Sequence, residues 1–176
     1  MNILFDGMIF DLQKSGGIST YSVEHINLFS KMTTTSLNLS GTSISNNVSA
    51  KNIKFENLDI TYDKRPLLRP FVSKPRKAVD VHYSTYYSYS SNPNCLNVGV
   101  LHDLIPERYY KGWQKWKNVV VRRHLLKKWD LIFTPSVTSR TDLLNYYGGQ
   151  YEDKIFVSYN GCSWTPISRA CYDLKK

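Results

Sequence analysis

The chain has 176 residues, a length that fits one domain able to bury about two thirds of the surface of its unfolded chain. Its 3 cysteines are too few and too scattered for a disulfide framework or a metal site, and we expect free thiols in a reducing cytoplasm. The net charge is +9, and we expect neither a signal peptide nor a transmembrane helix, because no stretch approaches the roughly 20 apolar residues of a membrane span.

The first predicted elements are a strand at residues 3–5 and a helix at residues 17–31, joined through Gly16 and Gly17. Adjacent glycines let backbone N–H groups approach a ligand closely, and the positive end of a helix dipole attracts phosphate. A glycine turn that only packs the helix on a sheet is at least as consistent with the pattern, because the spacing of a dinucleotide-binding motif is absent. Both interpretations stay open.

Apolar runs alternate with helical patterns along the rest of the chain. Further strands are predicted at residues 36–40, 79–83, 97–101, 131–134 and 155–158, and further helices at residues 113–129 and 136–147. Ser136 is the expected N-cap of the last helix, Gly148 and Gly149 are its expected stop, and residues 40–49 form a polar loop. The alternation predicts an α/β fold, a Rossmann-like parallel sheet with helices on both faces.

The basic residues concentrate in two segments that contain no acidic residue. The first lies between Glu107 and Asp130 and holds Lys111, Lys115, Lys117, Arg122, Arg123, Lys127 and Lys128, interleaved with Trp113, Trp116 and Trp129. The second holds Lys64, Arg65, Arg69, Lys74, Arg76 and Lys77. Cations mixed with tryptophan suit an anionic membrane surface, to which we assign Lys115, Arg122, Arg123, Lys127 and Lys128.

A solvated helix with its tryptophans in the core is the alternative for the first basic segment, since apolar positions 113–129 do not form one clean stripe. Nucleic acid is not an expected partner, because no nucleic-acid-binding motif accompanies the charge.

Two strand ends carry candidate functional residues. His102 directly follows the strand at residues 97–101 and so lies at the carboxyl end of a parallel strand, where open α/β sheets bind ligands. Its neutral imidazole can hydrogen-bond a sugar hydroxyl or a developing charge, and Asp103 either orients the imidazole or caps the following turn. Tyr83, Tyr86, Tyr87 and Tyr89 follow another strand end and either stack on sugar rings or pack the loop.

Several of these segments resemble one enzyme family in the same order. They are ILFDG at residues 3–7, LQKSGGISTY at 12–21, DVHYSTYY at 80–87, VGVLHDLIP at 98–106, DLIFTPS at 130–136, TDLL at 141–144 and KIFVSYNG at 154–161. Together they resemble the N-terminal half of the glycosyltransferase family 4 enzymes, which have the GT-B fold. Residues 40–79 carry little of the resemblance.

The resemblance implies a retaining glycosyltransferase that moves a sugar from a nucleotide-sugar donor to a lipid-linked or oligosaccharide acceptor in surface polysaccharide biosynthesis, such as O-antigen or capsule. It implies no metal and no cofactor beyond the donor, and the Asp-x-Asp metal motif is absent from the sequence. By the same resemblance, Gly16 and Gly17 lie near the donor diphosphate, and His102 and Asp103 at the transferred sugar. Tyr83, Tyr86 and Tyr87 are expected at the acceptor.

The family also predicts the domain organisation. Residues 1–161 are expected to form the acceptor-side domain and residues 162–176 the start of a linker, while the second, donor-binding domain with the family's paired glutamates is not in this sequence. We therefore expect a cytoplasmic protein, peripheral at the inner face of the cytoplasmic membrane, that is inactive without its donor-binding partner domain. The alternative is a catalytically silent module that binds an acceptor or a membrane and works with a separate chain.

Overall fold

The computed structural model describes residues 1–31, 36–41, 47–54, 58–62, 71–73 and 78–160. The second basic segment from Lys64 to Lys77 lies outside the described residues, apart from the backbone of residues 71–73. Residues 42–46 of the polar loop at residues 40–49 and the linker at residues 162–176 also lie outside them.

Seven parallel strands form the central sheet in the order β3-β2-β1-β5-β7-β8-β9. Their bounds are Asn2–Phe5 for β1, Ser36–Gly41 for β2, Leu58–Tyr62 for β3, Val81–Tyr83 for β5, Leu96–Val100 for β7, Leu131–Thr134 for β8 and Ile155–Val157 for β9. The strand order changes direction between β1 and β5, as in doubly wound sheets. The α/β, Rossmann-like prediction is confirmed.

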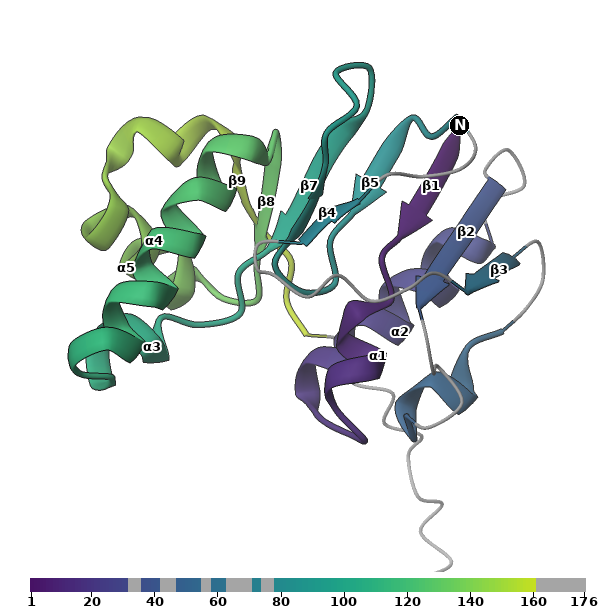
Figure 1. Ribbon diagram of the computed structural model, residues 1–176, viewed down its shortest axis with the longest axis horizontal. Coiled ribbons are helices and arrows are strands. Elements are labelled where there is room, and N and C mark those ends of the chain that lie inside the picture. Colours follow the sequence, from purple (N-terminus) through teal and green to yellow (C-terminus); the bar gives the residue numbers. More distant parts are fainter. Residues whose placement is uncertain (32–35, 42–46, 55–57, 63–70, 74–77, 161–176) are drawn as a thin grey trace, which may run out of the picture.

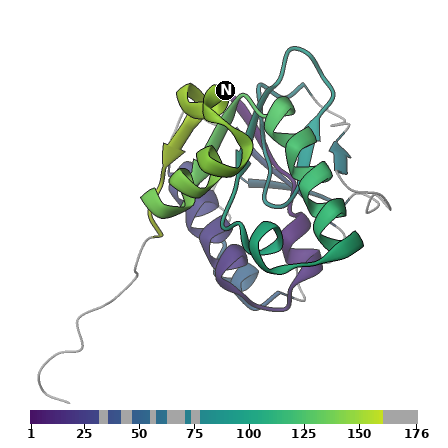
Figure 2. The same ribbon diagram turned by 90° about the vertical axis from the view of Figure 1, so that its left-hand side faces the viewer.

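The helices cover the sheet from both sides. They are α1 at Met8–Leu12, α2 at Gly17–Ser30, α3 at Ile105–Tyr109, α4 at Gly112–Lys128 and α5 at Val137–Tyr147. Figure 1 shows α3, α4 and α5 gathered beside β8 and β9, with α1 and α2 by β1 and β2. In the turned view of Figure 2, α2 and α4 lie apart from each other.

Successive side chains along each strand point to opposite faces of the sheet and therefore pack into two separate cores. In β8, Phe133 packs against the core that includes Tyr21 and Ile26 of α2, whereas Ile132 belongs to the core with Leu125 of α4 and Leu143 of α5. Such a period of two is what a strand covered on both faces requires.

The predicted boundaries of α5 are confirmed by its caps. The Ser136 hydroxyl oxygen accepts a hydrogen bond from the Ser139 N–H, and Gly148 ends the helix with a φ of 105° that side-chain-bearing residues rarely adopt. Strand β3 at the edge of the central sheet was not predicted, nor were the single-turn helices α1 and α3, the two-stranded sheet of β4 (Phe71–Ser73) and β6 (Ser88–Ser90), and the 3₁₀ turns Ser49–Asn52 and Gly149–Lys154. A helix of about one turn is too short to show a 3.6-residue period.

Trp129, at the end of α4, belongs to the core and not to the surface. It is 1% exposed, and its indole N–H donates to the Ser88 carbonyl over 2.8 Å. A Cβ atom on Gly99 of β7 would lie 2.0 Å from the Trp129 ring, so only glycine lets the indole pack this closely on the sheet. Trp113 and Trp116 differ, because they are 69% and 55% exposed and stack on each other.

Candidate functional site

The carboxyl edge of the sheet is organised by a buried carboxylate at the end of β1. Asp6 accepts hydrogen bonds from the backbone N–H groups of Met8 at 3.1 Å and Thr85 at 3.0 Å, and the hydroxyls of Thr85 and Ser88 also donate to it. The chain therefore ties the loop after β1 to the loop after β5. Sequence analysis missed this role of Asp6, although a carboxylate directly after a buried strand was a visible signal.

His102 lies at the same edge, as the sequence predicted, two residues after the end of β7. The Ser139 hydroxyl donates to its carbonyl over 3.1 Å, and the Tyr21 ring meets the imidazole edge-on at 5.1 Å between centroids. Its Nε2 is buried and has no hydrogen-bond partner among the described residues. Burial lowers the pKa of His102 to about 4, so its imidazole is neutral at pH 7.

Asp103 caps the turn that follows, one of the two roles predicted for it. Its Oδ1 accepts a hydrogen bond from the Ile105 N–H at 3.1 Å, at the start of α3. Its backbone carbonyl accepts a second bond from the Arg122 guanidinium at 2.7 Å. The segment that carries His102 is thus fastened on its carboxyl side by both a cap and a cation.

Arg122 was predicted to face a membrane, and the structure corrects this. The residue is 5% exposed, and its Nη1 lies 2.6 Å from Oε2 of Glu107, which is fully buried. Its Nε donates to the Tyr87 hydroxyl over 2.7 Å, and the Tyr147 hydroxyl donates to the other Glu107 oxygen. Two buried charges are costly unless they are paired and hydrogen-bonded, a condition that this cluster meets.

A pocket of about 350 Å³ opens between these groups. Its walls include Tyr86, Tyr87, His102, Asp103, Tyr110 and Arg122. The pocket therefore brings together the two predicted strand ends, with the neutral imidazole in its lining. Tyr110, from the end of α3, was not singled out in the sequence.

Tyr83 was also predicted at the acceptor, and the structure places it elsewhere. Its side chain is 2% exposed in the core of β5, and its hydroxyl lies 2.6 Å from Nδ1 of His25. Tyr86 and Tyr87 do line the pocket. Tyr89 lies in β6, with its ring beside His124.

The start of α2 leaves room beside Gly17 but not beside Gly16, where a Cβ atom would lie 2.6 Å from the Gln13 side chain. Gly16 has extended backbone, and a Cβ atom on Gly17 would meet no atom within 4 Å among the described residues, so packing does not account for glycine at position 17. A pocket of about 240 Å³ lies there, lined by Gly17, Thr20, Tyr21, Glu24, His25, Tyr159 and Asn160. Glu24 follows Gly17 by about two helical turns on the same face and adds one carboxylate to this lining.

The remaining basic residues of the first segment lie on the outside of α4. Arg123, Lys127 and Lys128 are exposed and Lys115 is half-buried. Exposed Trp113 and Trp116 belong to the same helix. Within the described residues, no helix is both long enough and apolar enough to cross a membrane.

Comparison with known proteins adds nothing to these observations: no protein-family model matches the chain, and no curated protein is similar to it. The family resemblance, and each site role drawn from it, therefore stays a prediction.

The buried ion pair allows a direct test of stability. Replacing Arg122 by alanine should lower the free energy of unfolding by about 3–5 kcal/mol, because Glu107 is left buried without its cation. Arg123→Ala, on the exposed side of the same helix, should change it by no more than about 0.5 kcal/mol. Urea unfolding followed by circular dichroism measures both values. Equal effects of the two substitutions would contradict a structural role for Arg122.

Proposed function

We propose that this chain is the acceptor-side domain of a retaining, metal-independent glycosyltransferase. It would bind a lipid-linked or oligosaccharide acceptor for surface polysaccharide biosynthesis, and a donor-binding domain would present the nucleotide sugar. The observation that carries the proposal is His102, whose neutral imidazole belongs to the lining of a pocket at the carboxyl edge of a parallel sheet.

The chemistry of the pocket is consistent with a sugar hydroxyl as the group that meets His102. A neutral imidazole with a free ring nitrogen can donate or accept a hydrogen bond, depending on its tautomer. Tyr86 and Tyr87 add aromatic surface, and Asp103 and Arg122 add polar groups whose positions are fixed by the capping and ion-pair contacts. A few fixed polar groups in a largely apolar pocket are typical of small-molecule sites.

The start of α2 is the proposed position of the donor diphosphate. The open space beside Gly17 would let a phosphate approach the first N–H groups of a 14-residue helix, where the helix dipole favours negative charge. His102 and His25 both contact the ring of Tyr21, which links this helix to the acceptor pocket.

A second candidate function is docking at an anionic membrane, with or without catalysis. The exposed face of α4 favours it, because tryptophans and cations on one helix suit the headgroup region. On this hypothesis the protein is peripheral at the cytoplasmic face of the membrane, where a lipid-linked acceptor would be met.

Substitution of His102 tests the leading function. In titrations of the chain with a panel of mono- and oligosaccharides, followed by NMR, His102→Leu should weaken binding at least tenfold, or about 1.4 kcal/mol, because a hydroxyl loses its partner. His124→Leu is the matched control, since His124 is exposed on α4 and lines neither of the pockets that contain Tyr87. Unchanged affinity in a folded His102→Leu protein, or no binding of any saccharide by the parent chain, would reject the proposal.

Charge reversal tests the membrane hypothesis. We expect loss of co-sedimentation with vesicles of anionic lipid when four cations of the first segment become glutamate: Lys115, Arg123, Lys127 and Lys128. The control reverses four exposed lysines elsewhere, Lys14, Lys31, Lys51 and Lys54, and should retain binding despite the same net charge. Binding should also weaken with salt, because the Debye length falls from about 8 Å at 0.15 M to about 3 Å at 1 M. Equal loss in both variants would mean nonspecific attraction.

A further inference from the structure

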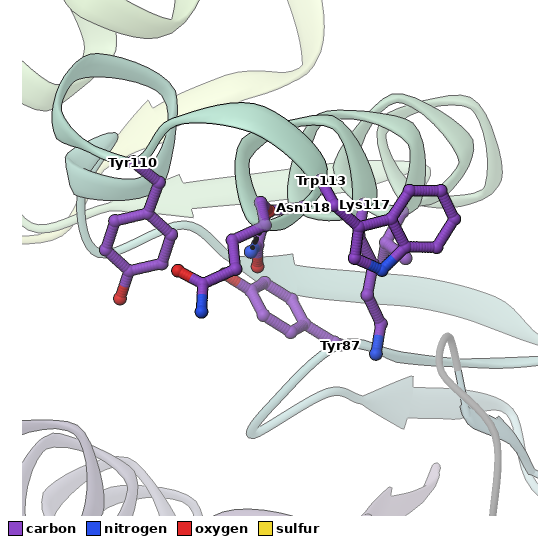
Figure 3. Close-up of a pocket in the computed structure, with 7 residues that line it drawn as sticks. Tyr87, Tyr110, Trp113, Lys117 and Asn118 are labelled. Carbon is purple, nitrogen blue, oxygen red and sulfur yellow. Dashed lines mark hydrogen bonds between the residues drawn. The ribbon is translucent and has the colours of Figure 1, made fainter.

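A second pocket adjoins the one that contains His102. It has a volume of about 360 Å³, and most of its lining residues belong to the first half of α4. Trp113, Gln114, Lys117 and Val121 line this pocket and not the first one. In the view of Figure 3, Tyr110 lies to one side of the Tyr87 ring, and Trp113 and Lys117 lie to the other.

The two pockets are adjacent and share part of their lining. Tyr87, Tyr110 and Asn118 line both of them, so these three side chains lie at the boundary between the two spaces. Each volume lies near the lower end of the range of small-molecule sites, about 300–1,000 Å³. A ligand of one ring would occupy one pocket, and a ligand of two linked rings would span both.

Tyr87 is held rigidly at the junction between the pockets. Its φ of 50° is the one positive value among the described non-glycine residues, and such conformations are concentrated at functional sites. Its hydroxyl accepts from Arg122, whose guanidinium carbon lies 5.3 Å from the centre of the Tyr87 ring. The buried ion pair therefore fixes the aromatic wall that both pockets share.

We propose that the second pocket binds the second sugar unit of the acceptor, the unit linked to the one that meets His102. This inference rests on the proposed function and adds a minimum acceptor length to it, a disaccharide. Trp113 and Tyr110 would flank the second ring, and Lys117 would hydrogen-bond its hydroxyls.

The lining of the second pocket matches the two-sided chemistry of a sugar. A pyranose has apolar C–H faces that pack on aromatic rings and hydroxyls around its rim that need hydrogen-bond partners. Trp113 is 69% exposed and Tyr110 is 42% exposed, so aromatic surface is available to a ligand. Asn118 already donates its amide N–H to the Gln114 carbonyl over 2.8 Å, an interaction that fixes its side chain at the boundary of the two pockets.

Trp113→Ala separates the second subsite from the first. In NMR or calorimetric titrations of the full chain, methyl hexosides and methyl N-acetylhexosaminides are compared with the corresponding disaccharides. The parent should bind its preferred disaccharide at least tenfold more tightly than the related monosaccharide. Trp113→Ala should remove this gain while changing monosaccharide affinity by less than twofold. Tyr109→Ala removes an aromatic ring of similar exposure, 71%, from outside both pockets, and should change neither affinity.

The outcomes distinguish this inference from the proposed function. If monosaccharides bind in a manner that depends on His102, but the disaccharide gain is absent or survives Trp113→Ala, the second subsite is wrong and the acceptor pocket stands. An equal effect of Trp113→Ala and Tyr109→Ala would also overturn it. If no saccharide binds the parent chain, the proposed function and this inference both fail. Thermal unfolding of each variant verifies that it is folded.

Discussion

The ion pair between Glu107 and Arg122 is the interaction on which the candidate site depends. Glu107 comes from α3, Arg122 from α4, and the hydroxyls of Tyr147 and Tyr87 complete the hydrogen bonds of the pair. Because uncompensated buried charges cost several kcal/mol, the three helices and the loop before β6 must keep one arrangement. Arg122 also holds the Asp103 carbonyl, so the constraint reaches the segment that carries His102.

A parallel sheet explains why the site lies where it does. The carboxyl ends of β1, β5 and β7 meet at one edge, and the loops that leave them carry Asp6, Tyr87 and His102. Asp6 binds the loops after β1 and β5 together, and the ion pair fixes the elements after β7. The edge is consequently rigid on both sides of the pocket, and a rigid pocket can orient a ligand at small cost in entropy.

All strands of the central sheet except β3, and the three longer helices, could be predicted from the sequence, because short apolar runs alternate with longer segments of helical spacing. Side-chain placement was harder. Arg122 and Arg123 are adjacent in a segment that contains no acidic residue, and only Glu107, 15 residues earlier and brought near by α3, makes one of them internal. The end of β5 at Tyr83 was predicted, but the sequence pattern does not show that the Tyr83 side chain packs into the core whereas Tyr87 lines the pocket.

The account requires a desolvated, neutral His102, and an NMR pH titration of its imidazole is the most direct test of that requirement. Burial should lower the pKa to about 4, so the ring protons should keep their neutral-form shifts from pH 7 down to about pH 5. His25 also has a lowered pKa of about 4, and the signal that disappears in His102→Leu identifies the right imidazole. A His102 pKa near the ordinary value of 6.5 would mean a solvated ring and would contradict the account.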